Sequence, residues 1–264
     1  MKSNIYRAMS QAFTGCTYLF LYVPLVLVFL YSFGKPGEGL SAGFTTQWYV
    51  DLLSSTDIRQ AFVTSILLAG LSAISATILG TFLAYGLSAM RPRHRRSASY
   101  LIYLPIITPS IIFGIADMVF FNYINRYTGL LQAGLPTMIL AHITFELPYV
   151  ALLVYAKLST IDPQLIDVIH DLYGNHGKVL RHLFLPVLSP TLLGGFLLVF
   201  TLSLDDLVIS FFTAGPSSVT VPIYIYGAIA KKGVTPEINA IASILVLASI
   251  TIALAGTVMR MDDK

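Results

Sequence analysis

Charged side chains are scarce in this sequence, and their scarcity excludes a soluble globular protein. Only 11% of the 264 residues are Asp, Glu, Lys or Arg, whereas 56% are hydrophobic and the mean hydropathy is +0.77. A water-soluble domain carries about 25% charged residues, because its surface has to be solvated. Many apolar side chains of this chain must therefore face lipid, which predicts an integral membrane protein.

Several functional motifs are also missing. The single cysteine, Cys16, excludes an intrachain disulfide and a thiolate metal site, and we expect it to be a small apolar residue of a membrane helix. No GxxxxGK[S/T] phosphate loop is present, so the sequence does not predict ATP hydrolysis by this chain. HExxH, GxSxG and CxxC patterns are missing, and the five histidines form no ligand cluster, so we expect no catalytic centre and no bound metal. A net charge of +3, spread along the chain, does not favour nucleic acid.

Long apolar stretches are what the chain has instead. A helix needs about 20 apolar residues to cross the bilayer with its backbone groups satisfied. Six segments meet this test, with approximate bounds 13–34, 59–90, 98–124, 135–158, 183–206 and 236–260. We therefore expect one all-α transmembrane domain over residues 1–264, whose first span is not a cleaved signal peptide. Gly, Ala and Ser are abundant in Ala69–Gly80, which predicts close approach of a neighbouring helix.

Lysine and arginine in the connections predict the orientation, because they favour the cytoplasmic side. The connections assigned to that side, together with both termini, hold more of them than the opposite set. They are Lys2, Arg7, Arg91, Arg93, Arg95, Arg96, Lys157, Lys178, Arg181, Arg260 and Lys264. Both termini are therefore expected in the cytoplasm. Gly34–Ile58 is expected outside, and Leu158–His182 is expected inside as a pair of short helices.

Among the acidic residues of these spans we single out four, namely Asp117, Glu146, Asp205 and Asp206. A charge buried in hydrocarbon costs roughly 2.5–3.5 kcal/mol, so such residues usually have a function. No lysine or arginine of the spans is placed to neutralise them, and we interpret them as the lining of a water-filled path for a cation. In the predicted orientation the aspartates fall in the outer half of the membrane and Glu146 near its middle.

Each of these acids also has a structural interpretation. Asp205 or Asp206 can be solvated or can cap the next helix, and at most one of them faces a narrow path because adjacent helical residues point about 100° apart. Glu146 can bind backbone groups freed by Pro148, and Asp117 can lie near the outer mouth of the path.

Two further residues have alternative interpretations. His142 precedes Glu146 by one helical turn, so it is a candidate hydrogen-bond partner of that acid, and a structural role is the simpler interpretation. Trp48 lies in an aromatic group suited to the membrane interface. We expect an interfacial anchor there, with a cation–π contact to an amine as the alternative.

The segments DVIHDLYG at 167–174 and VLRHLFLP at 179–186 resemble the EAA loop of permease subunits from binding-protein-dependent ABC importers. In that family the loop forms coupling helices that dock on a cytoplasmic ATPase. The sequence departs from the pattern by an aspartate in place of the family glutamate, by Val168 and Ile169 in place of alanines, and by a tyrosine where glycine is usual. The resemblance implies the type I importer permease fold, ATP and Mg²⁺ bound by the partner ATPase, and docking through Asp167, His170, Leu172, Tyr173, Gly174, Arg181, Leu185 and Pro186.

A second resemblance covers nearly the whole chain. FTTQWY at 44–49, HITF at 142–145, FTLSLDDLVIS at 200–210, TAGP at 213–216 and GVTPEINA at 233–240 are similar to the second permease subunit of spermidine/putrescine importers. Ser110 stands where that family has an acid, and Asp117 follows it by seven residues, on roughly the same helix face. By position, the resemblance implies roles in polyamine uptake for Trp48, Asp167, Ser203, Asp205 and Asp206.

The resemblance implies a polyamine permease of the bacterial cytoplasmic membrane. Its partners would be a homologous second permease, two ATPase subunits, a periplasmic polyamine-binding protein and the membrane lipid. Asp205 or Asp206, with Ser203, Glu146 and Asp117, would receive the ammonium groups of the substrate. An importer of another small solute is one alternative. An unpowered channel or a membrane enzyme is another, although the spans hold no paired catalytic groups at one depth.

Overall fold

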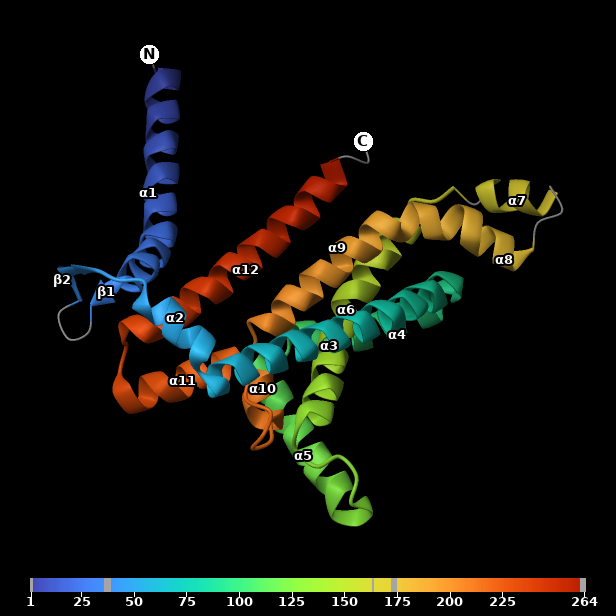
Figure 1. Cartoon of the computed structure of the whole chain (residues 1–264). Coiled ribbons are helices and arrows are strands. Elements are labelled where there is room, and N and C mark those ends of the chain that lie inside the picture. The colour runs from blue at the N-terminus through green and yellow to red at the C-terminus, as the bar shows by residue number, and fades with distance from the viewer. Residues whose placement is uncertain (1, 36–38, 163, 172–174, 262–264) are drawn as a thin grey trace. The chain divides into compact units, whose positions relative to one another are not determined.

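The computed structural model describes residues 2–35, 39–162, 164–171 and 175–261, and most of them are helical (Figure 1). The chain divides into two compact units, residues 1–59 with 224–247 and residues 60–223 with 248–264. Four helices in the described ranges are long and apolar enough to cross a membrane, or five if one bent helix pair is a single span. The expected all-α membrane class is confirmed, whereas the number of six spans stays a prediction.

The first unit contains the amino-terminal helix and a small β-hairpin that the sequence did not predict. Its elements are α1 (Lys2–Tyr31), β1 (Gly34–Lys35), β2 (Gly39–Phe44), α2 (Gln47–Ser54), most of α11 (Val221–Lys232) and the first half of α12 (Pro236–Met261). The strands pair antiparallel, and Gly43 adopts a φ of 105° that side chains rarely tolerate. The hairpin and α2 together account for most of the long connection 34–58.

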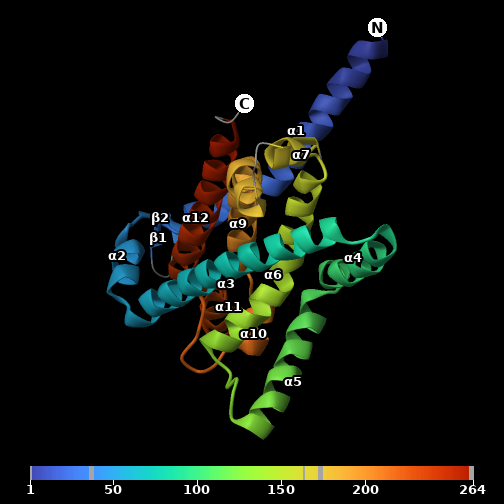
Figure 2. The same cartoon turned by 90° about the vertical axis from the view of Figure 1, so that its right-hand side faces the viewer.

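The second unit is built from α3 (Thr56–Ala89), α4 (Pro92–Ile107), α5 (Ser110–Thr128), α6 (Leu135–Leu158), α9 (Leu185–Leu204) and α10 (Val208–Thr213). The segment 98–124, expected as a single helix, is divided between α4 and α5 (Figure 2). The direction of the helix axis bends by 102° from α4 to α5. Thr108 between them is extended, with ψ at 129°. The residue before a proline avoids the helical conformation, so Pro109 ends α4 here. The expectation of one continuous helix is therefore wrong.

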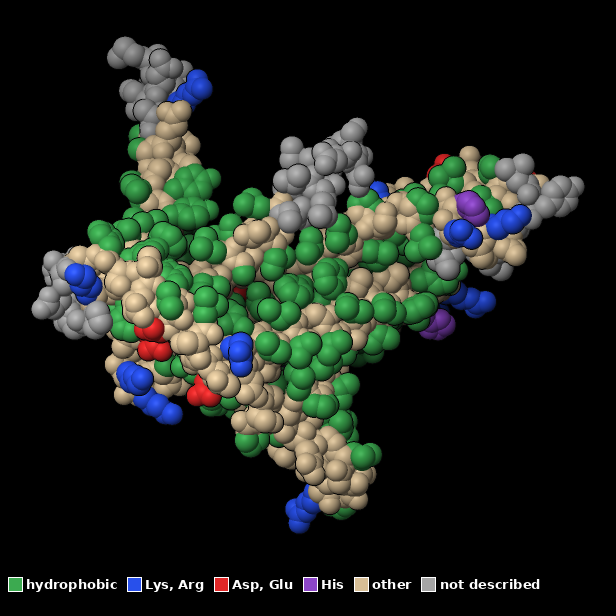
Figure 3. Space-filling view, in the orientation of Figure 1, with side chains coloured by type: hydrophobic (Ala, Val, Ile, Leu, Met, Phe, Trp, Pro, Cys, Tyr) green, Lys and Arg blue, Asp and Glu red, His purple; other side chains and the backbone are tan. Residues whose placement is uncertain are grey.

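Hydrophobic side chains cover much of the helical surface seen in Figure 3, and lysine and arginine lie mainly at the ends of helices and in the connections. In α1 the apolar stretch Met9–Tyr31 is exposed along its length. Such a surface would aggregate in water, so lipid or other subunits must cover it.

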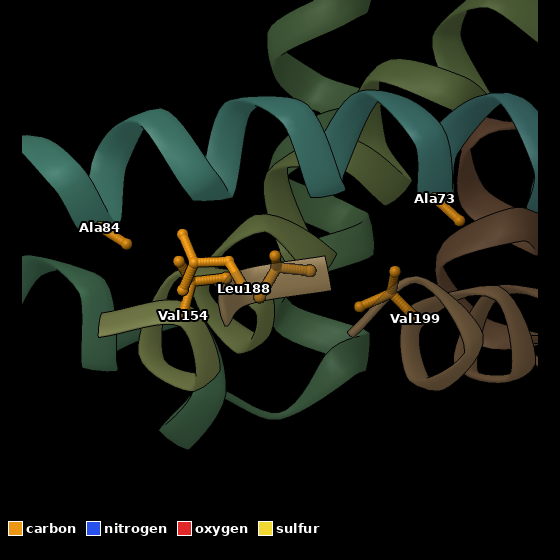
Figure 4. Close-up of a cluster of buried hydrophobic side chains, with 6 residues drawn as sticks. Ala73, Ala84, Val154, Leu188 and Val199 are labelled. Atoms are coloured by element: carbon orange, nitrogen blue, oxygen red, sulfur yellow. The ribbon is translucent and has the colours of Figure 1, made fainter. Parts of the chain in front are cut away.

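The core of the second unit lies between α3, α6 and α9. Figure 4 shows Ala73 and Ala84 of α3 near Val154 of α6 and near Leu188 and Val199 of α9. These side chains are at most 5% exposed. Small residues on α3 and branched residues on its neighbours allow the three backbones to pack closely.

Gly80 marks a close approach of α3 to α6. A Cβ atom on this residue would lie 2.9 Å from Val150 Cβ and 3.0 Å from the carbonyl oxygen of Leu147. These distances are shorter than ordinary van der Waals contacts, so the crossing requires glycine. The close packing predicted for Ala69–Gly80 is confirmed, and this crossing helps to fix the polar side chains of α3 and α6 relative to each other.

The connection between α6 and α9 contains α7 (Gln164–Asp171), α8 (His176–Val179) and a π-helical segment, η1 (Leu180–Phe184), that leads directly into α9. The expected first short helix is present, whereas the second is continuous with the following span. Of the predicted docking residues, Asp167, Arg181, Leu185 and Pro186 are exposed. Leu172, Tyr173 and Gly174 lie outside the described residues, as does the side chain of His170, whose backbone belongs to α7.

Candidate functional site

A buried polar cluster lies in the second unit where α3, α6, α9 and α10 meet. We define it by six side chains: Ser72, His142, Glu146, Ser203, Asp206 and Ser210. Five of them are at most 4% exposed, and Asp206 is 15% exposed. Polar groups buried this deeply require hydrogen-bond partners, and these residues supply them to one another.

Glu146 lies in the middle of α6 and is 1% exposed. Ser72 Oγ of α3 donates a hydrogen bond to Glu146 Oε1 over 3.2 Å, and His142 Nδ1 is 3.5 Å from the same oxygen. The second carboxylate oxygen, Oε2, is buried without a hydrogen-bond partner among the described residues. Glu146 is therefore enclosed within its own subunit in this conformation.

His142 lies between two carboxylates. Its Nδ1 is 2.7 Å from Ser203 Oγ, and its Nε2 is 3.0 Å from Ser210 Oγ and 3.5 Å from Asp206 Oδ2. Thus one ring nitrogen faces Glu146 and the other faces Asp206. The expected proximity of His142 to Glu146 is confirmed, whereas its contact with Asp206 was not predicted.

Asp206 also holds the start of α10. Its carboxylate accepts hydrogen bonds from the backbone N–H groups of Ile209 at 3.4 Å and Ser210 at 2.8 Å. Such bonds satisfy donors that the first turn of a helix leaves free. The structural interpretation considered for the aspartate pair therefore applies to Asp206.

Asp205 differs from its neighbour, because its side chain is exposed. Ser249 Oγ of α12 donates a hydrogen bond to Asp205 Oδ1 over 3.1 Å. Within the described ranges, no lysine or arginine forms an ion pair with Asp205 or with the other three acids. Asp205 directly follows the candidate span Gly177–Leu204, and an exposed carboxylate next to lipid would be costly, so we expect water or a second subunit to cover it.

The structure brings Glu146, Ser203 and Asp206 into this cluster, whereas Asp117, Asp205 and Trp48 are not members of it. Asp117 on α5 is half-buried and interacts electrostatically with His142, while its Oδ2 has no hydrogen-bond partner in the described part of the chain. Trp48 belongs to the first unit, where its Nε1 donates to the carbonyl oxygen of Gly34 over 2.8 Å.

Sequence reasoning missed Ser72 and Ser210. Serine is common in membrane helices and by itself carries little information about partners. The one available signal was the small-residue stretch around Ser72, since a hydroxyl there can donate to whatever helix packs against it. In the described ranges, no three His, Cys, Asp or Glu side chains are arranged to hold a metal ion.

Comparison with known proteins identifies the family of this chain. Residues 76–261 match the family described as binding-protein-dependent transport system inner membrane component. The chain is 33% identical over 257 residues to the spermidine/putrescine transport system permease protein PotC of Escherichia coli (strain K12), an alignment that covers 97% of this chain and 95% of PotC. It is 34% identical over 231 residues to the putrescine transport system permease protein PotI of the same strain, covering 86% of this chain and 82% of PotI.

The fold is also shared with a solved transporter. A chain in the crystal structure of a bacterial ABC transporter involved in the import of the acidic polysaccharide alginate superposes with a TM-score of 0.76 at 19% identity, covering 98% of this chain and 95% of that chain. The expected ABC importer permease fold is confirmed. The alternative of a membrane enzyme is wrong, because these relatives are transport subunits. This multi-pass chain belongs to the family of inner membrane components of binding-protein-dependent transport systems.

Proposed function

We propose that this chain is one of two permease subunits of an ATP-driven polyamine importer in the bacterial cytoplasmic membrane. A homologous second permease completes the path, and a periplasmic polyamine-binding protein delivers spermidine or putrescine to its outer end. Two cytoplasmic ATPase subunits bind ATP and Mg²⁺ and drive alternating access. Both termini lie in the cytoplasm, as the distribution of lysine and arginine favours.

The observation that carries this proposal is the excess of carboxylates at and near the carboxyl-terminal end of α9, which the proposed orientation places on the outer side. Asp205 and Asp206 follow the last residue of that helix, and Asp117 and Glu146 lie in neighbouring helices of the same unit. A polyamine carries several ammonium groups, so a path lined by carboxylates lowers the cost of bringing it into the membrane. The identity to PotC and PotI over most of the chain supports the same substrate class.

The four acids have different roles in this proposal. Asp205 is exposed and meets the substrate ammonium directly. Asp206 and Glu146 are more buried than Asp205, and both lie next to His142. Ser203 of α9 forms a hydrogen bond with the same histidine. Asp117, whose Oδ2 has no hydrogen-bond partner among the described residues, contributes negative potential beside the cluster. Trp48 anchors the outer connection at the membrane interface, and a cation–π contact of its ring with an amine is the alternative role.

The loop around α7 docks the ATPase in this proposal. Its exposed members Asp167 and Arg181 present charges of both signs, and Leu185 and Pro186 are exposed where α9 begins. His170, Leu172, Tyr173 and Gly174 are proposed for the same surface from the sequence pattern. A helical segment that joins two spans can transmit the motion of the ATPase to the path.

Transport by the whole complex tests the function. The two permeases and the ATPase pair are reconstituted into liposomes with the cognate binding protein, and uptake of labelled spermidine and putrescine is measured with and without ATP. Methionine and a neutral disaccharide serve as control solutes. We expect ATP-dependent uptake of the polyamines and little uptake of the controls. Uptake that needs no ATP, or that favours a control solute, would refute the proposal.

A further inference from the structure

The surroundings of His142 differ from those of an ordinary buried histidine. An uncharged imidazole has one N–H group and one lone pair, so it usually faces one donor and one acceptor. Here each ring nitrogen has a serine oxygen at 2.7 or 3.0 Å and a carboxylate oxygen at 3.5 Å. A serine hydroxyl can donate or accept, whereas an ionised carboxylate only accepts, so ionised Glu146 and Asp206 both favour an N–H group on the ring nitrogen that faces them.

The serine hydroxyls complete this arrangement on the Glu146 side. Ser72 Oγ donates to Glu146 Oε1, and Ser72 Oγ and Ser203 Oγ are 3.2 Å apart. If Nδ1–H donates to Ser203, then Ser203 can donate to Ser72 and Ser72 to the carboxylate. In this series of hydrogen bonds every donor then points away from the ring and towards the carboxylate of Glu146. On the other side, Nε2–H can donate to Ser210 Oγ, while the backbone N–H of Ser210 donates to Asp206.

The charges around the ring favour the same state. Glu146 on α6 and Asp206 after α9 flank the imidazole, and Asp117 on α5 interacts with it electrostatically. Among the described residues, the side chains of α3, α9 and α10 that hydrogen-bond to the ring or to Glu146 are serines, which are uncharged. Burying two or three carboxylates without a cation is costly, and a cation placed between them offsets part of that cost.

We infer that His142 is held as an imidazolium ion and acts as the internal counter-ion and positioning residue of the acid cluster. Its single positive charge offsets part of the negative charge of Glu146 and Asp206 when no substrate is present, and its two N–H groups tie α6 to the corner between α9 and α10. This corner sets the direction of Asp205, the adjacent residue. The part of the inference that concerns Asp205 rests on the proposed function, whereas the charge state of His142 does not.

Nitrogen-15 NMR of the whole transporter, with histidine labelled in this subunit, tests the charge state. His142→Gln identifies the resonances by difference, and Ser210→Ala identifies them if that variant fails to assemble, because Ser210 contacts Nε2 alone. At neutral pH we expect both ring nitrogens of His142 to carry protons. A spectrum with one protonated and one unprotonated nitrogen would overturn the inference.

A double-mutant cycle tests the positioning role. The melting temperature of the assembled transporter is compared for His142→Gln, Glu146→Gln and the pair. Since a charge left alone in the interior is costly, we expect the pair to lose less than the sum of the single changes, by roughly 2–8 °C. Additive losses would overturn the role. A transporter that shows the expected spectrum and coupling but carries no polyamine would instead refute the proposed function and leave the His142 inference in place.

Discussion

Gly80 lies where α3 and α6 come close together, and its replacement by alanine tests whether this contact is as tight as described. The new Cβ atom would lie 2.9 Å from Val150 Cβ and 3.0 Å from the carbonyl oxygen of Leu147. Ordinary carbon–carbon contacts are about 3.5–4.0 Å, so the helices have to separate by several tenths of an ångström. Neither neighbouring atom is at the end of a flexible side chain, so neither can move aside without the helix.

Overpacking of this kind costs about 1–3 kcal/mol. For a protein of this size each kcal/mol lowers the melting temperature by about 2–4 °C, so Gly80→Ala should lower it by roughly 2–12 °C. The assay is thermal unfolding of the reconstituted transporter. Uptake should fall as well, since separation of α3 from α6 lengthens the contact between Ser72 and Glu146.

Gly86→Ala on the same helix is the matched control, because a Cβ atom there would meet nothing within 4 Å. Alanine favours a helix by up to about 1 kcal/mol over glycine, so the control should be neutral or slightly stabilised. Equal melting temperatures for the two variants would refute the close contact of α3 with α6.

Three other substitutions separate the remaining roles. Ser72→Ala removes the hydroxyl donor of Glu146 and should cost about 1–3 kcal/mol in thermal unfolding, whereas Ser88→Ala, at an exposed position of the same helix, should change it little. Trp48→Phe keeps an aromatic ring but loses the hydrogen bond from the indole N–H to the carbonyl oxygen of Gly34, so the stability should fall by about 1 kcal/mol. The KM for spermidine should stay within about twofold of the original. A tenfold higher KM would favour the cation–π role. Asp167→Lys reverses a charge on the proposed docking surface and should reduce copurification of the ATPase, which Asp57→Lys, remote in sequence from that loop, should leave intact.

Much of the fold follows from local sequence, because a span is recognised by the length of its apolar run. The expected segment 135–158 coincides with α6. The break at Thr108–Pro109 also has a local cause, since the residue before a proline avoids the helical conformation. Hydropathy alone did not reveal this break, because the residues on both sides of it are apolar. The hairpin β1–β2 depends on a two-strand pairing of a glycine-rich connection, and hydropathy carries no signal for such pairing.

The candidate site was predictable in part. Because a charged side chain is costly inside the membrane, the sequence alone was sufficient to choose Glu146, Asp205 and Asp206 as candidate site residues. Helical spacing placed His142 next to Glu146. The sequence could not predict which of the two adjacent aspartates is the more buried, since this depends on how the chain turns after α9. That turn brings Asp206 to His142 and leaves Asp205 exposed, although the two are adjacent in sequence.

The KM for spermidine after Asp205→Asn tests the central claim most directly. Loss of one carboxylate–ammonium contact costs about 1.5–3 kcal/mol, which corresponds to a KM about 10- to 150-fold higher. Asp57→Asn, which removes an exposed carboxylate at the start of α3, serves as the control and should leave KM within about twofold. If Asp205→Asn is expressed and assembled normally and transports spermidine with the original KM, this carboxylate does not meet the substrate and the account of the path is contradicted.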